Sequence, residues 1–564
     1  MKQSLMRTLA RYVPEETAER PRLRRALAFL DWSVEPDELI AASYASAVGF
    51  AALGLLVAVA LAGRVRLMVA GGALLLATVT LGVPRLVTLV ARTRRASAVG
   101  TAPALFTRTT LRMQLTPAPE AAARFGADAT PGRLADSLDG HVRRTANGPR
   151  SALASFARAW RPWAPELERA CSLVESASHE PPADRTRTLQ RARQVVLDGV
   201  HDRTTAFATS ITGPATALYA FGVLLPLSLV ALLPALSAAG TPVSPPLIVL
   251  VYDLLLPGIV VAASGWLLAK RPVAFRPTPI PRSHPSVTTE RWHAVLAGIA
   301  VAVLTWVGLR FVLPAWLAML AATGASIGTT LVVAFYPMQS VRERVEAVES
   351  GLADGLALVG RRVERGEATE QALDAAASEL PGALGEVFTT ATRRQRRLGV
   401  TIETAFTGAN GALSTLPSDR VASAAALLAL SAREGRPAGE ALVAMSEHVE
   451  TLDEVRTESR RAVGQVTSTL SNTAAVFAPL VGGATVALTD VMGAGGPLGG
   501  GLAVDALGLA IGCYVLVLAV VLTALATGLT HGFDRSLLGY RVGLAVLAAT
   551  TTYITAVVGT GLVV

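Results

Sequence analysis

Lysine and cysteine are nearly missing from this chain of 564 residues. Lys2 and Lys270 are the only lysines, so the formal net charge of +9 comes almost entirely from arginine. A phosphate-binding P-loop ends in a lysine followed by serine or threonine, and neither lysine is so placed, which excludes nucleotide binding of that kind. Cys171 lies in a charged segment and Cys513 in an apolar one, which excludes a disulfide framework and a four-cysteine metal site.

Histidines and aromatic residues are also few. The seven histidines are scattered, and we interpret His201 and His448 as surface residues rather than metal ligands. We find no catalytic residue, metal site or cofactor-binding motif, and we therefore predict that the protein is not an enzyme. Aromatic residues make up 5% of the chain, and no nucleic-acid-binding module accompanies the pI of about 10.1. The sequence therefore predicts no nucleic-acid partner.

Apolar residues are abundant instead. They make up 51% of the chain, and the mean hydropathy of +0.46 lies above the range of soluble proteins. About 20 apolar residues in a helix cross the hydrocarbon core of a bilayer, because a helix satisfies its own backbone hydrogen bonds. Nine windows meet this requirement and predict an all-α, multi-pass protein of the lipid bilayer. They cover residues 39–62, 68–92, 206–236, 246–269, 292–312, 315–338, 466–490, 503–528 and 541–564.

Two long polar stretches, at residues 93–205 and 339–465, interrupt these windows. Each is too charged for lipid, and each predicts a helical-bundle domain cut into short helices by turn signals such as Pro181-Pro182 and Pro381-Gly382. Four apolar residues of the second stretch follow the spacing of one helix face: Leu352, Leu356, Val359 and Val363.

The order of the segments occurs twice. Two spans, a polar domain and two more spans run from residue 39 to 269, and the same order runs from 292 to 528. We predict a tandem architectural repeat in parallel orientation, with a leader at residues 1–38 and a last single span at 541–564. The repeat rests on order and lengths, because residue identity between the halves is weak.

Basic residues in the short flanks and loops indicate the orientation. The leader, the loop from Lys270 to Arg291 and the loop from Arg535 to Arg541 are basic, and all three fall on one side if nine spans alternate. By the positive-inside rule, that side is the cytoplasm. We expect the N-terminus and both polar domains on this side of the cell membrane, and the glycine-rich loop at 493–501 outside. Three arginines fall on the outer side against the rule: Arg64, Arg66 and Arg310.

Two charged features are candidate binding sites. Asp253 lies several residues inside a predicted span, where charge is costly. It either contacts a partner helix or polar pathway, or reaches water or a hydroxyl near the membrane boundary. The other feature is an arginine block on a predicted helix, which is either a solvated face or a docking surface for an acidic partner. Its members are Arg393, Arg394, Arg396 and Arg397.

The second polar stretch resembles the cytoplasmic domain of the type II secretion system F family. The order and spacing of several short motifs between residues 352 and 465 carry the resemblance. They are Arg365-Gly366-Glu367-Ala368 before Ala372 and Leu373, Arg397-Leu398-Gly399 before Ala405, Ala432-Arg433-Glu434-Gly435 before Glu440, Ala441 and Leu442, and a charged helix, Glu450 to Arg461, that enters a span.

The membrane segments resemble the archaeal branch of the same family. The similar segments are Leu218 to Pro226, Leu232 to Ala235, Val251 to Asp253 and Phe477 to Gly483. The resemblance implies a membrane platform for type IV pilus-like filaments, whether pilus, archaellum or secretion pseudopilus. It also implies two partners, a hexameric secretion or assembly ATPase on the cytoplasmic bundles and pilin-like subunits at the spans. The platform itself would hydrolyse nothing and would form a homo-oligomer, such as a dimer.

Two other classes of protein compete with this interpretation. Repeats and proline-containing spans are also typical of secondary transporters, in which Asp253 would bind a coupling ion. Two large interrupting domains and few polar residues near mid-membrane argue against transport. A membrane enzyme is disfavoured, because no nucleophile and base lie together on the spans.

Overall fold

The computed structural model describes residues 20–60, 73, 80–130, 132–145, 151–238, 245–271, 280, 284, 287, 291–434, 436–494, 504–532 and 534–563. These residues form helices and connecting turns and contain no strand, so the all-α prediction is confirmed for them. Parts of four predicted features lie outside the described residues: the leader, the window 68–92 with Arg64 and Arg66 before it, the loop from Lys270 to Arg291 and the glycine-rich loop.

Eight helical runs within the described residues are long and apolar enough to cross a membrane. They overlap eight of the nine predicted windows and are compatible with a multi-pass membrane protein. In the remaining window, 68–92, residues 68–72 and 74–79 lie outside the described residues. The runs are Pro36–Val57, Pro182–Val230, Leu247–Lys270, Trp292–Leu309, Ala315–Glu364, Gly439–Val491, Val504–His531 and Arg535–Val563.

The apolar helices differ in how far they are enclosed. The apolar window of α24 (Val504–His531) is 61% buried, because α14, α16, α22, α23 and α25 pack around it. That of α15 (Arg291–Leu309) is only 11% buried and presents side chains such as Leu304 to the surroundings, as a lipid-facing helix does. The other helices of this part are α2 (Arg20–Leu30), α3 (Pro36–Ala60), α5 (Val83–Val99), α12 (Leu225–Ala238), α13 (Pro245–Val249), α14 (Leu256–Lys270), α16 (Ala315–Ser350), α23 (Ala478–Ala494) and α25 (Arg535–Val563).

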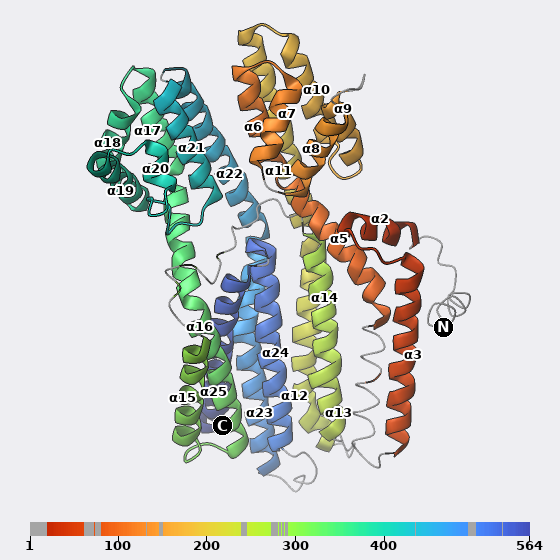
Figure 1. Ribbon diagram of the computed structural model, residues 1–564. Helices are drawn as coiled ribbons and strands as arrows, with labels where there is room; N and C mark the ends of the chain where they lie inside the picture. The colour runs from red at the N-terminus through yellow and green to blue at the C-terminus, as the bar shows by residue number, and fades with distance from the viewer. Residues whose placement is uncertain are drawn as a thin grey trace.

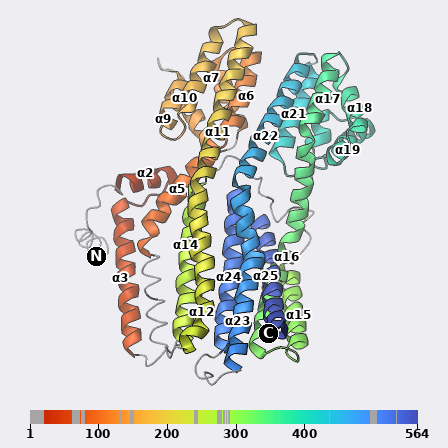
Figure 2. The same cartoon turned by 180° about the vertical axis from the view of Figure 1, so that it is seen from behind.

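Two groups of shorter helices each bury an apolar core of their own. The first helical bundle comprises α6 (Ala102–Leu115), α7 (Pro119–Ala129), α8 (Arg133–Thr145), α9 (Ala152–Trp160), α10 (Glu166–Ser176), η1 (Ala177–His179) and the start of α11 (Pro182–Tyr219). The second helical bundle comprises α17 (Leu352–Glu364), α18 (Thr369–Glu379), α19 (Ala383–Leu398), α20 (Ile402–Thr407), α21 (Asp419–Glu434) and the start of α22 (Arg436–Asn472). Both bundles lie at the same end of the apolar helices (Figures 1 and 2).

The apolar spacing and turn signals read from the sequence have the expected structural effect. Leu352, Leu356, Val359 and Val363 share the buried face of α17, each at most 1% exposed, which confirms that prediction. The helix α11 begins at Pro182. Proline suits this position because it has no N–H, and N–H groups in the first turn of a helix have no acceptor within the helix. Gly382 precedes α19 with a φ of 82°, a conformation that favours glycine.

Three long helices run without a break from the bundles into the apolar part. They are α11 with 38 residues, α16 with 36 and α22 with 37. The predicted boundaries at 205/206, 338/339 and 465/466 therefore fall inside helices. Side-chain polarity changes at these points, but the backbone hydrogen bonds continue, since an α-helix satisfies them equally in water and in lipid.

Glycines let α16 and α25 approach closely. Gly324 and Gly328 on α16 are four residues apart, and a Cβ on Gly328 would lie 2.6 Å from the Leu547 side chain and 3.0 Å from the Gly543 carbonyl oxygen. A Cβ on Gly543 would lie 2.9 Å from the Gly328 carbonyl oxygen. This small-residue spacing is typical of helix pairs in membranes, where close backbone packing replaces the hydrophobic effect. The last helix, predicted outside the repeat, therefore packs against the second half of the chain.

We expect Gly328→Ala to lower the free energy of unfolding by about 1–3 kcal/mol, because its methyl group forces α16 and α25 apart. Unfolding of the purified protein in mixed micelles, followed by circular dichroism during titration with dodecyl sulfate, measures this. The matched control is Gly265→Ala on α14, where a Cβ meets nothing within 4 Å. Equal stability of the two variants would show that the close approach is unimportant.

Candidate functional site

The structure places the predicted site residues far apart in the fold. Asp253 lies half-buried among the apolar helices, in a π-helical segment, η3 (Leu250–Leu255), inside the run Leu247–Lys270. The arginine block lies on α19, in the second helical bundle. The two predicted sites are therefore separate, and no single site contains both.

The arginine block is partly neutralised within its own bundle. Arg396 forms an ion pair with Asp374 of α18, with 2.5 Å between Nη2 and Oδ2. Arg393 and Arg397 are exposed, and they are four residues apart on the same helix. Both views show α18 and α19 on the side of the second bundle that faces away from the first (Figures 1 and 2). Arg393 and Arg397 thus remain available to an acidic partner.

Prolines interrupt three apolar helices in the same way. The π-helical segments η2 (Ala220–Leu224), η3 and η4 (Thr473–Phe477) each end two residues before a proline: Pro226, Pro257 and Pro479. In each segment a backbone N–H donates to a carbonyl five residues earlier, as from Leu225 to Ala220. The wider turn accommodates the proline ring, which clashes with the carbonyl four residues before it in a regular α-helix.

Hydroxyl groups from neighbouring helices take up carbonyls that the prolines leave free. Pro226 cannot donate to the Gly222 carbonyl, and the Tyr514 hydroxyl of α24 donates to it instead. Pro479 likewise leaves the Ala475 carbonyl without its usual N–H donor, and the Thr552 hydroxyl of α25 donates to this carbonyl at 3.4 Å. An unsatisfied carbonyl costs several kcal/mol in lipid. These hydrogen bonds therefore position α24 against the helix that Pro226 interrupts, and α25 against the helix that Pro479 interrupts.

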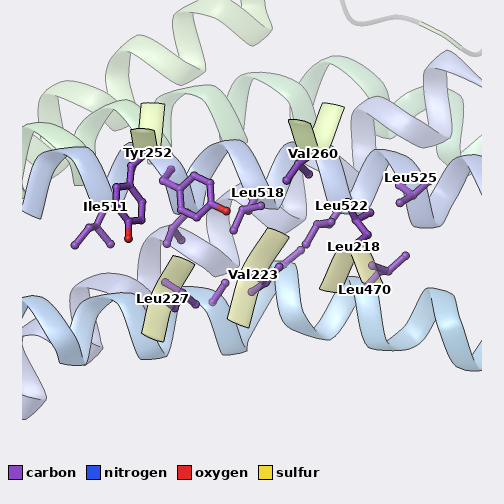
Figure 3. Close-up of a cluster of buried hydrophobic side chains, with 14 of the residues drawn as sticks. Leu218, Val223, Leu227, Tyr252, Val260, Leu470, Ile511, Leu518, Leu522 and Leu525 are labelled. Carbon is purple, nitrogen blue, oxygen red and sulfur yellow. The ribbon is translucent and has the colours of Figure 1, made fainter. Parts of the chain in front are cut away.

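The tyrosine contacts lie within the largest apolar core. Tyr252, next to Asp253, donates its hydroxyl to the Pro226 carbonyl at 2.7 Å, and its ring meets that of Tyr514 edge-on with centroids 5.7 Å apart. Figure 3 shows Tyr252 among apolar side chains of α24 and of the segment around Pro226, including Ile511 and Leu227. Asp253 therefore lies beside the contact between α24 and the helix that Pro226 interrupts.

A buried ion pair joins α16, the helix that leads from the apolar part into the second bundle, to the turn before α25. Arg342 of α16 and Asp534, in the turn before α25, form an ion pair with side chains only 7% and 8% exposed. Asp534 also caps α25, because its Oδ1 accepts hydrogen bonds from the Ser536 N–H at 2.7 Å and the Ser536 hydroxyl at 2.5 Å. One carboxylate therefore fixes the start of α25 and the position of α16 together.

More charged groups surround this pair and link α16 to α21 and α22. Glu349 of α16 accepts a hydrogen bond from the Ser418 hydroxyl at 2.6 Å, and Arg420 and Arg456 lie 3.9 Å and 3.7 Å from its other oxygen. Two further ion pairs are Arg420 with Asp453 at 2.7 Å and Arg460 with Glu346 at 3.9 Å. We call this network the charged junction; it comprises Arg342, Glu346, Glu349, Arg420, Asp453, Arg456, Arg460, Asp534 and Arg271.

Arg271 connects the charged junction to the first half of the chain. It directly follows α14 and donates to the Thr530 carbonyl at the end of α24, at 3.3 Å, where a cation is favoured by the helix dipole. Burial, and then the nearby charge of Arg460, lower the pKa of Arg271 to about 10. The guanidinium therefore stays charged at neutral pH and holds α14 against α24.

The sequence interpretation assigned no role to the charged junction. A signal was present, because Arg342, Glu346 and Glu349 follow helical spacing just after an apolar window. Their partners on α22 and before α25 are more than a hundred residues away in the sequence, so only the fold brings them together. Among the described residues, no group of three or more His, Cys, Asp or Glu side chains could hold a metal ion.

Compared with models of protein families, with curated proteins and with solved structures, the chain gives no match in any of the three comparisons.

We expect Arg342→Met to lower the free energy of unfolding by about 3–5 kcal/mol, because it leaves the Asp534 carboxylate buried without its partner. The same titration with dodecyl sulfate measures the loss. Arg342→Met with Asp534→Asn removes the stranded charge and should be more stable than the single variant. The control Arg161→Met breaks a pair with side chains 66% and 54% exposed and should cost at most about 1 kcal/mol. A strictly additive double variant would contradict the pairing.

We expect Tyr514→Phe to lower the free energy of unfolding by about 1–2 kcal/mol, because the Gly222 carbonyl then lacks a donor in apolar surroundings. The ring and its packing are kept, so the loss isolates the hydroxyl. Tyr336→Phe is the matched control, since that side chain is 58% exposed. If Tyr514→Phe leaves the free energy of unfolding unchanged, the hydrogen bond from the hydroxyl to the Gly222 carbonyl does not stabilise the fold.

Proposed function

We propose that this protein is a non-enzymatic membrane platform for the assembly of type IV pilus-like filaments. It couples a hexameric secretion ATPase in the cytoplasm to membrane-embedded pilin-like subunits, and it acts as a homo-oligomer, such as a dimer. The observation that carries the proposal is the continuity of α11, α16 and α22, which run from the two bundles into the apolar helices without a loop. A displacement of either bundle by a motor therefore moves the spans directly.

The arrangement of the bundles supports a cytoplasmic location for both. They share one end of the apolar helices (Figure 1), as expected if the basic flanks and both polar domains face the cytoplasm. The tandem repeat is supported by matching helix interruptions. In one half α11 passes through η2 into α12 with Pro226, and in the other α22 passes through η4 into α23 with Pro479. A ninth span at 68–92 and the cytoplasmic leader complete the proposed topology.

The two bundles contact each other, which supports coupled movement. Arg108 of α6 donates to the Ser423 hydroxyl of α21 at 2.9 Å. His201 of α11 lies 3.6 Å from Glu458 of α22. Each bundle thus contacts the other as well as the long helices that lead from it into the apolar part. The charged junction then connects α16 and α22 to α24 and α25. Force applied to one bundle is shared by both halves of the membrane part.

The arginine block is the proposed contact with the ATPase. We expect Arg393→Glu with Arg397→Glu to reduce co-purification of the cell's own secretion ATPase at least about tenfold and to abolish filaments, because two exposed charges are reversed on one helix face. Affinity purification from cell membranes and electron microscopy of filaments measure the two effects. Arg396 is left unchanged, since it pairs with Asp374.

The matched control reverses two exposed arginines at the same spacing on α11: Arg187→Glu with Arg191→Glu. Equal co-purification of the ATPase by both variants and wild type would reject the docking role of the block. A secondary transporter is the second candidate, favoured by half-buried Asp253 in a wide helical turn. Ion-gradient-driven uptake by proteoliposomes that hold only this protein would favour transport.

A further inference from the structure

A cavity of about 700 Å³ lies between α2, α5 and α11, beside the turn that joins α9 to α10. Five of the side chains that line it are arginines, and an indole ring, that of Trp163, also lines it. We call it the arginine cavity. Its arginines are Arg22, Arg25, Arg92, Arg95 and Arg203.

Within the described part of the chain, few acidic side chains compensate the positive charge of the arginine cavity. Arg203 pairs with Glu166, with 2.5 Å between the two side chains. Among the described residues, Arg22, Arg25 and Arg92 have no acidic side chain within ion-pair distance. Burial, followed by the charges of Arg25 and Arg92, lowers the pKa of Arg95. Like charges around one cavity raise the free energy of the folded protein, and a bound anion lowers it.

Two guanidinium nitrogens of the cavity residues are also left without an acceptor. The Arg95 Nε and the Arg203 Nη2 are buried and have no hydrogen-bond partner among the described residues. The Arg95 guanidinium lies over the rings of Phe29 and Trp163, 4.7 Å and 4.9 Å from their centroids, so its position is set by stacking. The donors are thus held in place before any ligand binds.

The charged junction of the second bundle shows what is missing from the first. There, four arginines form ion pairs with four carboxylates, and Arg271 donates to a backbone carbonyl; the carboxylates are Glu346, Glu349, Asp453 and Asp534. In the arginine cavity, at the corresponding end of the first bundle, Glu166 is the one carboxylate among the described residues that pairs with any of the five arginines. Within the described residues, most arginines of the charged junction therefore have a carboxylate partner, whereas most arginines of the cavity do not.

The position of the cavity indicates the ligand. Helix α2 buries an apolar face against α5, carries exposed arginines and lies across the direction of the apolar helices (Figure 1). On α5, exposed Leu86 and Val90 come just before Arg92, so the cavity borders apolar surface that faces outward. Basic pockets beside apolar helices bind the phosphates of lipid headgroups.

We propose that the arginine cavity binds a phosphate group, carried by an anionic lipid headgroup or by a free anion. Guanidinium groups bind phosphate oxygens through paired hydrogen bonds, and several of them around one cavity give a site for a multiply charged oxyanion. The anion supplies the negative charge that joins α2, α5 and α11. This inference is independent of the proposed filament function, and its test uses the purified full-length protein alone.

The test compares two double variants of equal charge. All four of the substituted arginines are exposed: Arg25→Gln with Arg92→Gln removes two that line the cavity, whereas Arg24→Gln with Arg94→Gln removes two on the same helices that do not. Binding of dioleoyl-phosphatidylglycerol and of dioleoyl-phosphatidylcholine is measured by native mass spectrometry, and binding of inorganic phosphate by calorimetry, in detergent. We expect the Kd for the anionic probe to rise at least about tenfold in the lining variant and to stay within about twofold of wild type in the control.

The two anionic probes identify the source of the phosphate. Binding of phosphatidylglycerol at least about tenfold tighter than phosphate assigns the cavity to a lipid headgroup, and equal binding assigns it to a free anion. Equal loss in both variants, or no loss in either, overturns the proposal, because bulk surface charge then explains the binding. Melting without lipid or phosphate checks folding: the lining variant should melt no lower than wild type, because a repulsion is removed. If it melts lower, Arg92→Gln alone must still weaken binding, or the proposal fails.

Discussion

The fold depends on satisfying backbone carbonyls in surroundings that contain no water. Prolines at positions 226 and 479 interrupt the helices that descend from the two bundles, and each deprives a carbonyl of its usual N–H donor. Tyr514 and Thr552 replace those donors, which places α24 against the first interrupted helix and α25 against the second. The central position of α24 follows from this constraint together with its apolar surface. The interrupted helices and the two helices that supply the hydroxyls therefore form one interdependent core.

Charge is handled differently at the two places where the bundles meet the apolar helices. Beneath the second bundle, Asp534 and Glu349 form ion pairs with arginines from several helices, so the chain itself supplies carboxylates to this junction. Beneath the first bundle, the part of the chain that the structure describes supplies one carboxylate to the five guanidinium groups of the arginine cavity. In the proposed platform, the first arrangement transmits movement through fixed contacts, whereas the second makes the position of α2 and α5 depend on a bound anion. One half of the protein is then rigid at its junction, and the other responds to its surroundings.

Much of the architecture could be predicted, and the exceptions have physical causes. The all-α class and the buried face of α17 follow from the spacing of apolar residues along single helices, which is a local property of the sequence. The domain boundaries at 205/206, 338/339 and 465/466 lie inside continuous helices, because polarity changes along a helix without breaking it. The pairing of Arg396 with Asp374 needed the packing of α18 on α19, and a run of arginines does not reveal which member is neutralised.

By itself, the sequence determined which segments are apolar enough to enter lipid, that they are helical, and that two polar helical regions interrupt them. Those properties depend on composition and on contacts between residues a few positions apart. Tertiary structure alone decided that Asp534 meets Arg342, that Tyr514 reaches Gly222 and that arginines of α2, α5 and α11 face one cavity. Each of these contacts joins residues far apart in the chain, and its existence depends on how whole helices pack, which no local pattern encodes.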